Sequence, residues 1–413
     1  MKNRIIGFIL CMTLGISAVV GYTACKSIRN MNNEPQTVVL RLALREGTYA
    51  NVVQDSLEEF EAEHNVKCEL LELSEEELRK TVEESADNPG SVDLCMVDGS
   101  WVTEFTDDDL LLNLSEAGYA LNSDIIPATT DISYKDGDVY VAPYFGNVTV
   151  LLFNKKILSH AGYEKGDIHS FEDVLTICKN AEENGIIGFL YRGDTNNNLV
   201  VDFLPVLLAY GGWVVDEENQ PTVNTREFKD AMSFYLELIN TGKATTKDDI
   251  VNAITGGHGA MAIAWPGWYT PGDDSTADYC SIEGRAQNGS EVYNANIYGI
   301  WGLAVSAQSS NKELSIDLLE YLMSREVQLD SVDVGGVPCR YSCLNNQNVL
   351  QKYPEYKDVC TALEKGVYRP MTSNWSDFMD ILAPHMSDII YGKDTMEHGL
   401  ETAQTELEVL MGE

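Results

Sequence analysis

Positive charge is scarce in this 413-residue chain, where 28 lysines and arginines stand against 65 aspartates and glutamates. The formal net charge is -37. Binding to nucleic-acid phosphates needs clustered cations, so this balance argues strongly against a nucleic-acid partner. Hydrophobic residues make up 44% and charged residues 23%, which is typical of a globular protein. We interpret the acidity as a solvated surface that keeps the protein soluble.

The sequence also lacks the short motifs of several catalytic and metal-binding classes. It has no GxxxxGK[ST] phosphate loop and no HExxH pair, and segment 302–306 has no nucleophile elbow. The acidic runs 75–77 and 107–109 lack the spacing of a calcium loop and are interpreted as solvated helix starts. We therefore expect no metal, no cofactor and no catalytic residue.

None of the nine cysteines forms a CxxC pair, and their spacing suggests no zinc site. Cys11 and Cys25 belong to the N-terminal segment, which leaves seven. Cys339 and Cys343 are close enough in sequence for a disulfide in an oxidising compartment. Free thiols in a reducing environment are the alternative, and the sequence leaves both open.

The N-terminus has the sequence pattern expected of an export signal. Lys2 and Arg4 precede an apolar stretch over 5–20, and small residues lead to Cys25. This arrangement resembles a bacterial lipoprotein signal, in which Cys25 is lipidated and becomes the mature N-terminus. An uncleaved single-span anchor is the alternative.

Residues 1–25 are thus predicted to be a lipoprotein signal peptide, although Tyr22 stands where that signal usually has leucine. The polar segment 26–37 is expected to be a flexible tether. No later apolar run is long enough to span a bilayer. We expect an extracytoplasmic protein, lipid-anchored at the outer face of the cytoplasmic membrane.

The body alternates between strand and helix patterns. Apolar alternation predicts strands and helical spacing predicts helices, beginning with strands at 38–44, 66–73 and 92–97 and helices at 51–64 and 75–85. This order predicts a mostly parallel sheet with helices on both faces. Further strands are predicted within 139–153, at 260–265 and at 299–305, and further helices at 171–184, 202–210, 225–240, 314–324 and 396–411. Ligands of such sheets bind beyond the carboxyl ends of the strands, which directs attention to loops 46–49 and 98–101.

Several stretches resemble, in sequence and in order, the solute-binding proteins of ABC importers of the maltose-binding type. The resemblance extends from about residue 38 to the C-terminus, and its segments lie at 48–68, 92–114, 143–158, 210–213, 259–268, 336–340 and 368–370. It implies an α/β, two-lobed, periplasmic-binding-protein-like (type II) fold with crossing hinge strands and a central ligand cleft. Lobe 1 is expected to comprise 38–145 with 303–345, and lobe 2 to comprise 146–302 with 346–413.

The resemblance further implies a monomer that captures a small molecule and delivers it to an ABC permease in the membrane. A sugar has apolar C–H faces and a ring of hydroxyls, so a site for it needs flat aromatic rings and fixed polar partners. All six tryptophans fall at strand ends or motif positions, although core packing is the alternative for each aromatic residue and the better interpretation of Trp301. We expect Asp98, Asn147 and Arg369 to bond sugar hydroxyls, with a surface ion pair as the alternative for Arg369.

Carried over by position, the expected ligand contacts are Tyr49, Asp98, Ser100, Trp101, Phe145, Asn147, Trp213, Trp265, Gly267, Trp268, Arg369 and Trp375. Other solutes stay open, namely a polyamine, a polyol or glycerol phosphate, with polyamine the strongest rival. So do an extracellular glycoside hydrolase and a sensor subunit that presents sugar to a receptor.

Overall fold

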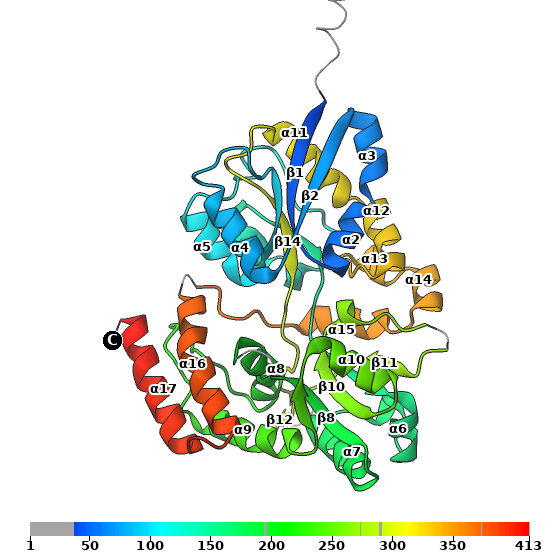
Figure 1. The fold of residues 1–413 in the computed structure, drawn as a ribbon, viewed down its shortest axis with the longest axis vertical. Helices are drawn as coiled ribbons and strands as arrows, with labels where there is room; N and C mark the ends of the chain where they lie inside the picture. The colour runs from blue at the N-terminus through cyan, green and yellow to red at the C-terminus, as the bar shows by residue number, and fades with distance from the viewer. Residues whose placement is uncertain (1–36, 194–195, 273, 289–290, 373, 413) are drawn as a thin grey trace, which may run out of the picture.

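The computed structural model describes residues 37–412 except 194–195, 273, 289–290 and 373. The predicted signal peptide, the lipidation site Cys25 and nearly all of the predicted tether lie outside this range. Figure 1 shows two α/β lobes stacked along the longest axis of the molecule. None of the helices that the structure describes is long and apolar enough to cross a membrane.

The first lobe is built on a five-stranded sheet. Its strand order is β2 (Val66–Leu73), β1 (Val38–Arg45), β3 (Leu94–Asp98), β14 (Trp301–Val305) and β6 (Ala142–Phe145). β1 pairs in parallel with both β2 and β3, whereas β14 runs antiparallel to its neighbours β3 and β6. The expected mostly parallel sheet is therefore present, with one reversed strand.

Helices pack around this sheet, and those near the predicted ranges 51–64, 75–85 and 314–324 are joined by two that were not predicted. They are α2 (Thr48–Gln54), α3 (Leu57–His64), α4 (Glu75–Glu84), α5 (Val102–Asp107), α11 (Lys312–Leu322) and α12 (Arg325–Ser331). The predicted helix over 51–64 is two helices, α2 and α3, separated at Asp55 and Ser56. α4 begins at a capping box, in which the Ser74 side chain accepts from the Glu77 backbone and Glu77 accepts from Ser74.

The second lobe repeats this plan. Its sheet has the order β11 (Ala277–Cys280), β7 (Val150–Asn154), β10 (Gly259–Ala264), β8 (Ile187–Arg192) and β9 (Lys243–Thr245). β10, β8 and β9 are parallel, and β7 is the reversed strand. In each sheet the reversed strand is the one that the chain forms just after crossing from the other lobe.

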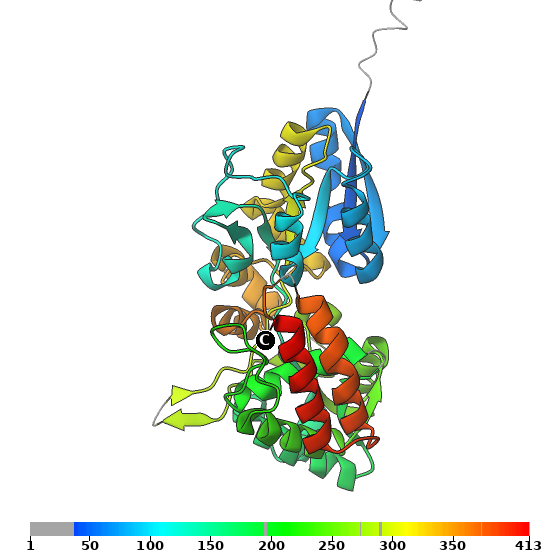
Figure 2. The same ribbon diagram turned by 90° about the vertical axis from the view of Figure 1, so that its left-hand side faces the viewer.

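Helices of the second lobe are α6 (Lys155–His160), α7 (Phe171–Glu183), α8 (Asn196–Ala209), α9 (Arg226–Ile239), α10 (Lys247–Thr255), α16 (Trp375–Ile390) and α17 (Met396–Met411). The capping box expected at the start of α7 forms between Ser170 and Asp173. α16 was not predicted, and it packs between α8 and α17. Two short hairpins form separate two-stranded sheets, β4 (Tyr134–Lys135) with β5 (Asp138–Val139) and β12 (Ala286–Asn288) with β13 (Glu291–Val292). The second hairpin projects from the second lobe in Figure 2.

Three crossing segments join the lobes. The first passes through Thr149, whose backbone N–H donates to the carbonyl of Ile297 on the second crossing at 2.9 Å. Ile297 forms a parallel bridge with Val367, which lies on the third crossing. The crossing segments that the resemblance implies are thus bonded to one another.

The division of the chain between the lobes differs from the prediction at one segment. Residues from 346 onward were assigned to lobe 2, but α14 (Gln347–Lys352) and α15 (Tyr356–Lys365) lie at the junction with α13 (Tyr341–Leu344). α15 packs against residues 127–129 of the first lobe and also against β11 of the second. Only α16 and α17 of this stretch belong wholly to the second lobe.

All seven cysteines that the structure describes are buried free thiols, and Cys339 is not joined to Cys343. Burial raises the pKa of the Cys339 thiol to about 12, so it is protonated at neutral pH.

Gly242 provides a test of the second lobe's packing. A Cβ atom at this position would overlap the backbone carbonyl of Phe189 on β8, which has no flexible end to move aside. We expect Gly242→Ala to lower the free energy of unfolding by about 1–3 kcal/mol, measured by urea denaturation. Gly166→Ala is the matched control because nothing lies within 4 Å of its added Cβ, and it should change stability little. Equal stability of the two variants would contradict the expectation.

Candidate ligand-binding cleft

A cleft of about 1370 Å³ lies between the lobes. The first lobe contributes the segments that follow β1, β2 and β3, at residues 45–49, 72–76 and 98–101. The second lobe contributes the end of β8, the segment after β10 at 265–268 and the start of α16. The cleft therefore lies at the carboxyl ends of parallel strands, where the sheet topology places ligand sites.

Ten of the twelve residues predicted to contact ligand line this cleft. They are Tyr49, Asp98, Ser100, Trp101, Asn147, Trp265, Gly267, Trp268, Arg369 and Trp375. Trp301, which was interpreted as core, is only 4% exposed but also lines the cleft. Its indole thus belongs to both the core and the cleft wall.

The structure places Phe145 and Trp213 away from the cleft surface. Phe145 is 1% exposed and lies behind Tyr49, with 4.5 Å between the ring centroids. Trp213 follows the predicted glycine turn but packs, partly buried, on the core of the second lobe. Its backbone carbonyl accepts a hydrogen bond from the Thr222 hydroxyl at 2.8 Å.

Aromatic rings form a continuous wall in the first lobe. The ring of Trp301 lies 5.7 Å from Tyr49 and 5.3 Å, edge-on, from Trp101. Burial raises the pKa of Tyr49, so its hydroxyl stays protonated, and this hydroxyl accepts a hydrogen bond from Asn147 Nδ2 at 3.0 Å. The wall offers flat apolar faces with polar groups at one edge, which suits a sugar ring.

A buried ion pair stands at the floor of the cleft. Arg369 Nη2 donates to Asp98 Oδ1 at 2.6 Å, and the two side chains are 15% and 5% exposed. The same carboxylate oxygen accepts from the backbone N–H of Ser100 at 2.9 Å and from its hydroxyl at 2.6 Å. Burial disfavours the charge of Arg369, but Asp98 and a second carboxylate, Glu75, outweigh it and raise the pKa of the guanidinium. Arg369 thus forms the ion pair considered from sequence, inside the cleft and not on the outer surface.

Sequence reasoning did not assign several charged residues that line the cleft, among them Glu75, Glu76, Arg79, Arg192 and Lys247. Glu75 and Glu76 follow β2, the parallel strand whose carboxyl end shares the sheet edge with those of β1 and β3. Applying the carboxyl-end rule to β2 as well would have found them. Arg192 ends β8, pairs with Asp202 and lies 5.1 Å from the ring centroid of Trp268.

The fold has two α/β lobes, which three crossing segments join, and a cleft lies between them. This arrangement defines a two-lobed solute-binding protein. The model of the bacterial extracellular solute-binding protein family matches residues 46–329, and the chain belongs to this family. It is the substrate-binding subunit of an ABC transporter, as two curated relatives also indicate.

One of these relatives is a probable ABC transporter-binding protein of Deinococcus radiodurans, 22% identical over 303 residues, which are 69% of this chain and 72% of the relative. The other is a probable amino-acid ABC transporter periplasmic-binding protein of Sinorhizobium fredii. It is 21% identical over 231 residues, and the match spans 54% of this chain and 53% of that relative.

Solved structures share the fold. The maltose-bound MalE3 of T. maritima has a TM-score of 0.79 and 22% identity, with 91% of this chain and all of that chain covered. An ABC transporter solute-binding protein of Thermotoga lettingae, bound with α-D-tagatose, has a TM-score of 0.79 and 18% identity over 92% of this chain and 100% of its own. An ABC transporter solute-binding protein of Agrobacterium radiobacter, in complex with ribitol, has a TM-score of 0.79 and 19% identity. The match covers 91% of this chain and 100% of that chain.

Proposed function

We propose that this subunit captures a sugar or oligosaccharide in the cleft and delivers it unchanged to a membrane permease. The observation that carries the proposal is the aromatic wall of Tyr49, Trp301 and Trp101 beside the fixed polar groups of Asp98 and Arg369. Stacking on apolar faces and hydrogen bonds to hydroxyls are the two interactions that a sugar needs. The maltose and tagatose complexes of structural neighbours support this class of solute, whereas the ribitol complex of another neighbour agrees with the polyol alternative.

Lobe closure is the proposed means of capture. The cleft volume of about 1370 Å³ exceeds the range of roughly 300–1,000 Å³ for small-molecule pockets, which suits an open state or a ligand of several rings. The lobes already touch at the cleft, where the Thr48 hydroxyl donates to the carbonyl of Gly267 at 3.4 Å. A ligand that contacts both lobes stabilises the closed state over the open one, and the permease then distinguishes loaded from empty protein by shape.

The proposed location is the outer face of the cytoplasmic membrane. Membership of the extracellular solute-binding protein family supports a location outside the cytoplasm. The signal-like sequence before residue 26 supports attachment to the membrane through a lipid on Cys25. A permease in the same membrane would then find its loaded partner within reach of the tether.

A thermal-shift screen of residues 26–413 tests the proposal against mono- and oligosaccharides, polyols, glycerol phosphate, amino acids and polyamines. A ligand at 100 times its dissociation constant adds about 2.7 kcal/mol of stability, which is a measurable shift. We expect a shift with one group of sugars, each recovered unchanged after incubation.

Other results of the screen would redirect the assignment. Cleavage of the bound sugar would favour a glycoside hydrolase. Shifts confined to the non-sugar solutes would overturn the sugar assignment within the same fold. A shift with no solute in the panel would contradict the proposed function as stated.

A further inference from the structure

Arg192 is held at the cleft wall by a buried carboxylate. It ends β8, and both carboxylate oxygens of Asp202, on α8, bind it. Asp202 Oδ1 accepts from Arg192 Nε at 2.9 Å and from Nη2 at 2.5 Å, while Oδ2 accepts from the Arg192 backbone N–H at 2.8 Å. Asn198, near the start of the same helix, accepts from Nη1 at 2.7 Å. The side chains of Arg192 and Asp202 are 11% and 2% exposed, so the guanidinium has little freedom to move.

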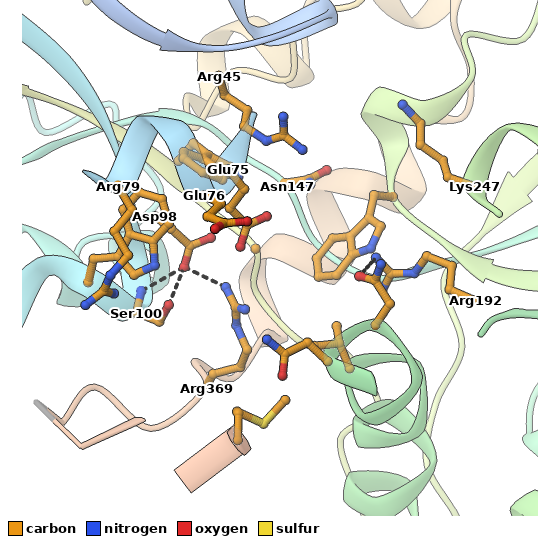
Figure 3. Close-up of a pocket in the computed structure, with 18 of the residues that line it drawn as sticks. Arg45, Glu75, Glu76, Arg79, Asp98, Ser100, Asn147, Arg192, Lys247 and Arg369 are labelled. Carbon is orange, nitrogen blue, oxygen red and sulfur yellow. Dashed lines mark hydrogen bonds and ion pairs between the residues drawn. The ribbon is translucent and has the colours of Figure 1, made fainter. Parts of the chain in front are cut away.

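The same guanidinium packs on a tryptophan of the cleft. Its Cζ lies 5.1 Å from the ring centroid of Trp268, which is within the range of a cation–π contact. Arg192 and Trp268 both line the cleft, and Figure 3 shows Arg192 on the opposite side of it from Asp98. A ligand therefore meets a hydrogen-bond donor and a flat ring that are in contact with each other before it binds.

The first lobe repeats this arrangement. Arg79 lies 5.7 Å from a ring centroid of Trp101 and pairs with Glu104 at 2.6 Å. Each lobe thus places an arginine, paired with a carboxylate, on a tryptophan of the cleft. The two arginines differ in how firmly they are held, because the Glu104 side chain is 28% exposed and that of Asp202 only 2%. Arg192 is therefore the better preorganised of the two, and less side-chain freedom is lost when it binds a ligand.

Arg192 keeps hydrogen-bonding capacity for a ligand. A guanidinium has five N–H groups, and acceptors in the described part of the chain take three of those of Arg192. One N–H on Nη1 and one on Nη2 remain. Because Asp202 balances the positive charge, these two donors suit the neutral hydroxyl oxygens of a sugar.

We propose that Arg192 is a specificity-determining residue, which donates hydrogen bonds to sugar hydroxyls from the second lobe. Asp202 is its positioning residue, which holds the guanidinium against Trp268 in the orientation that binds the sugar. The inference rests on the proposed function, because it takes the cleft to be a sugar site. It adds a fixed donor to the second lobe, opposite Asp98 and Arg369, so that a bound sugar is held from both lobes.

Isothermal titration of Arg192→Lys tests the contact with ligand. The probes are glucose, galactose, maltose, maltotriose, cellobiose and D-tagatose. Lysine keeps a positive charge beside Asp202 but lacks the planar group that both stacks on Trp268 and presents several donors in a fixed geometry. We expect a sugar of this panel that binds the unchanged protein to bind the variant at least about tenfold more weakly. Thermal unfolding of the free variant should change little, because the ion pair with Asp202 is kept.

Arg285→Lys is the matched control. Arg285 belongs to the same lobe, lies 4.4 Å from the ring centroid of Tyr210 and pairs with Glu172 at 3.1 Å, but it does not line the cleft. Its replacement removes the same kind of stacked and paired guanidinium. The affinity for the sugar should stay within about twofold of the original.

A double-mutant cycle tests the role of Asp202. Asp202→Asn should weaken binding of the same sugar by roughly three- to tenfold in the unchanged background, and by no more than about twofold in an Arg192→Met background. Only a residue that acts through Arg192 loses its effect on affinity when Arg192 is absent. Asp202→Glu, which keeps the charge and alters the geometry, gives the same comparison where the amide destabilises the fold.

The outcomes separate this inference from the proposed function. Equal affinity of Arg192→Lys and the unchanged protein would overturn the assignment of Arg192 and leave sugar binding standing. The same loss of affinity from the Asp202 replacement in both backgrounds would show a general structural role and overturn the positioning assignment. If no sugar of the panel bound the unchanged protein, the inference would fall together with the proposed function.

Discussion

Replacing Arg369 with methionine is expected to lower the free energy of unfolding by about 3 kcal/mol. Arg369 Nη2 lies 2.6 Å from Asp98 Oδ1, and both side chains are largely removed from water. Removing one partner of a buried ion pair typically costs roughly 3–5 kcal/mol because the other charge stays buried without compensation. We take the lower end because Ser100 still donates two hydrogen bonds to Asp98.

Urea denaturation of three variants measures this effect. Arg226→Met removes an i,i+4 ion pair with Asp230 whose side chains are 87% and 57% exposed, so it should change stability by less than about 1 kcal/mol. The double variant Arg369→Met with Asp98→Asn should recover part of the loss, because no charge is then left unpaired. An Arg369→Met variant as stable as Arg226→Met would show that water reaches Asp98 in solution.

The elements at the cleft floor follow from local sequence signals. Three strands have the alternating or apolar pattern that predicts a strand, namely Val38–Arg45, Val66–Leu73 and Leu94–Asp98. The expected parallel topology places their carboxyl ends at one edge of the sheet. That rule is enough to predict that Asp98, Ser100 and Tyr49 lie in the cleft. Arg369 lies in no regular element, and its place in the candidate site came from the family resemblance.

Other features depend on tertiary contacts that no local pattern records. Helix α16 packs between α8 and α17 and has apolar residues at helical spacing, among them Phe378 and Leu382, but Pro384 lies inside it, and an internal proline normally argues against a continuous helix. Trp213 and Trp268 both follow turns and read alike in the sequence. Which of them faces ligand depends on how each segment packs against the second lobe, and only Trp268 lines the cleft.

This difference between the two tryptophans gives the second large expected effect. We expect Trp268→Ala to weaken binding of the sugar found in the thermal-shift screen by roughly 10- to 100-fold, or about 1.4–2.7 kcal/mol. The Trp268 indole lines the cleft, is only partly buried and lies beneath the Arg192 guanidinium at 5.1 Å. Its removal takes a flat face from the ligand and leaves most of the protein core intact. Isothermal titration measures the affinity, and thermal unfolding of the free variant measures stability.

Trp213→Ala is the matched control, since it truncates a second partly buried tryptophan of the same lobe that does not line the cleft. It should lower stability by an amount comparable to Trp268→Ala and leave affinity within about twofold of the original, a binding change below roughly 0.5 kcal/mol. The comparison separates contact with ligand from support of the lobe, because only contact produces a loss of affinity without a matching loss of stability. If Trp213→Ala lost as much affinity as Trp268→Ala, the sugar would contact the segment around Trp213, or closure would depend on that segment. The cleft would then not be the principal binding surface.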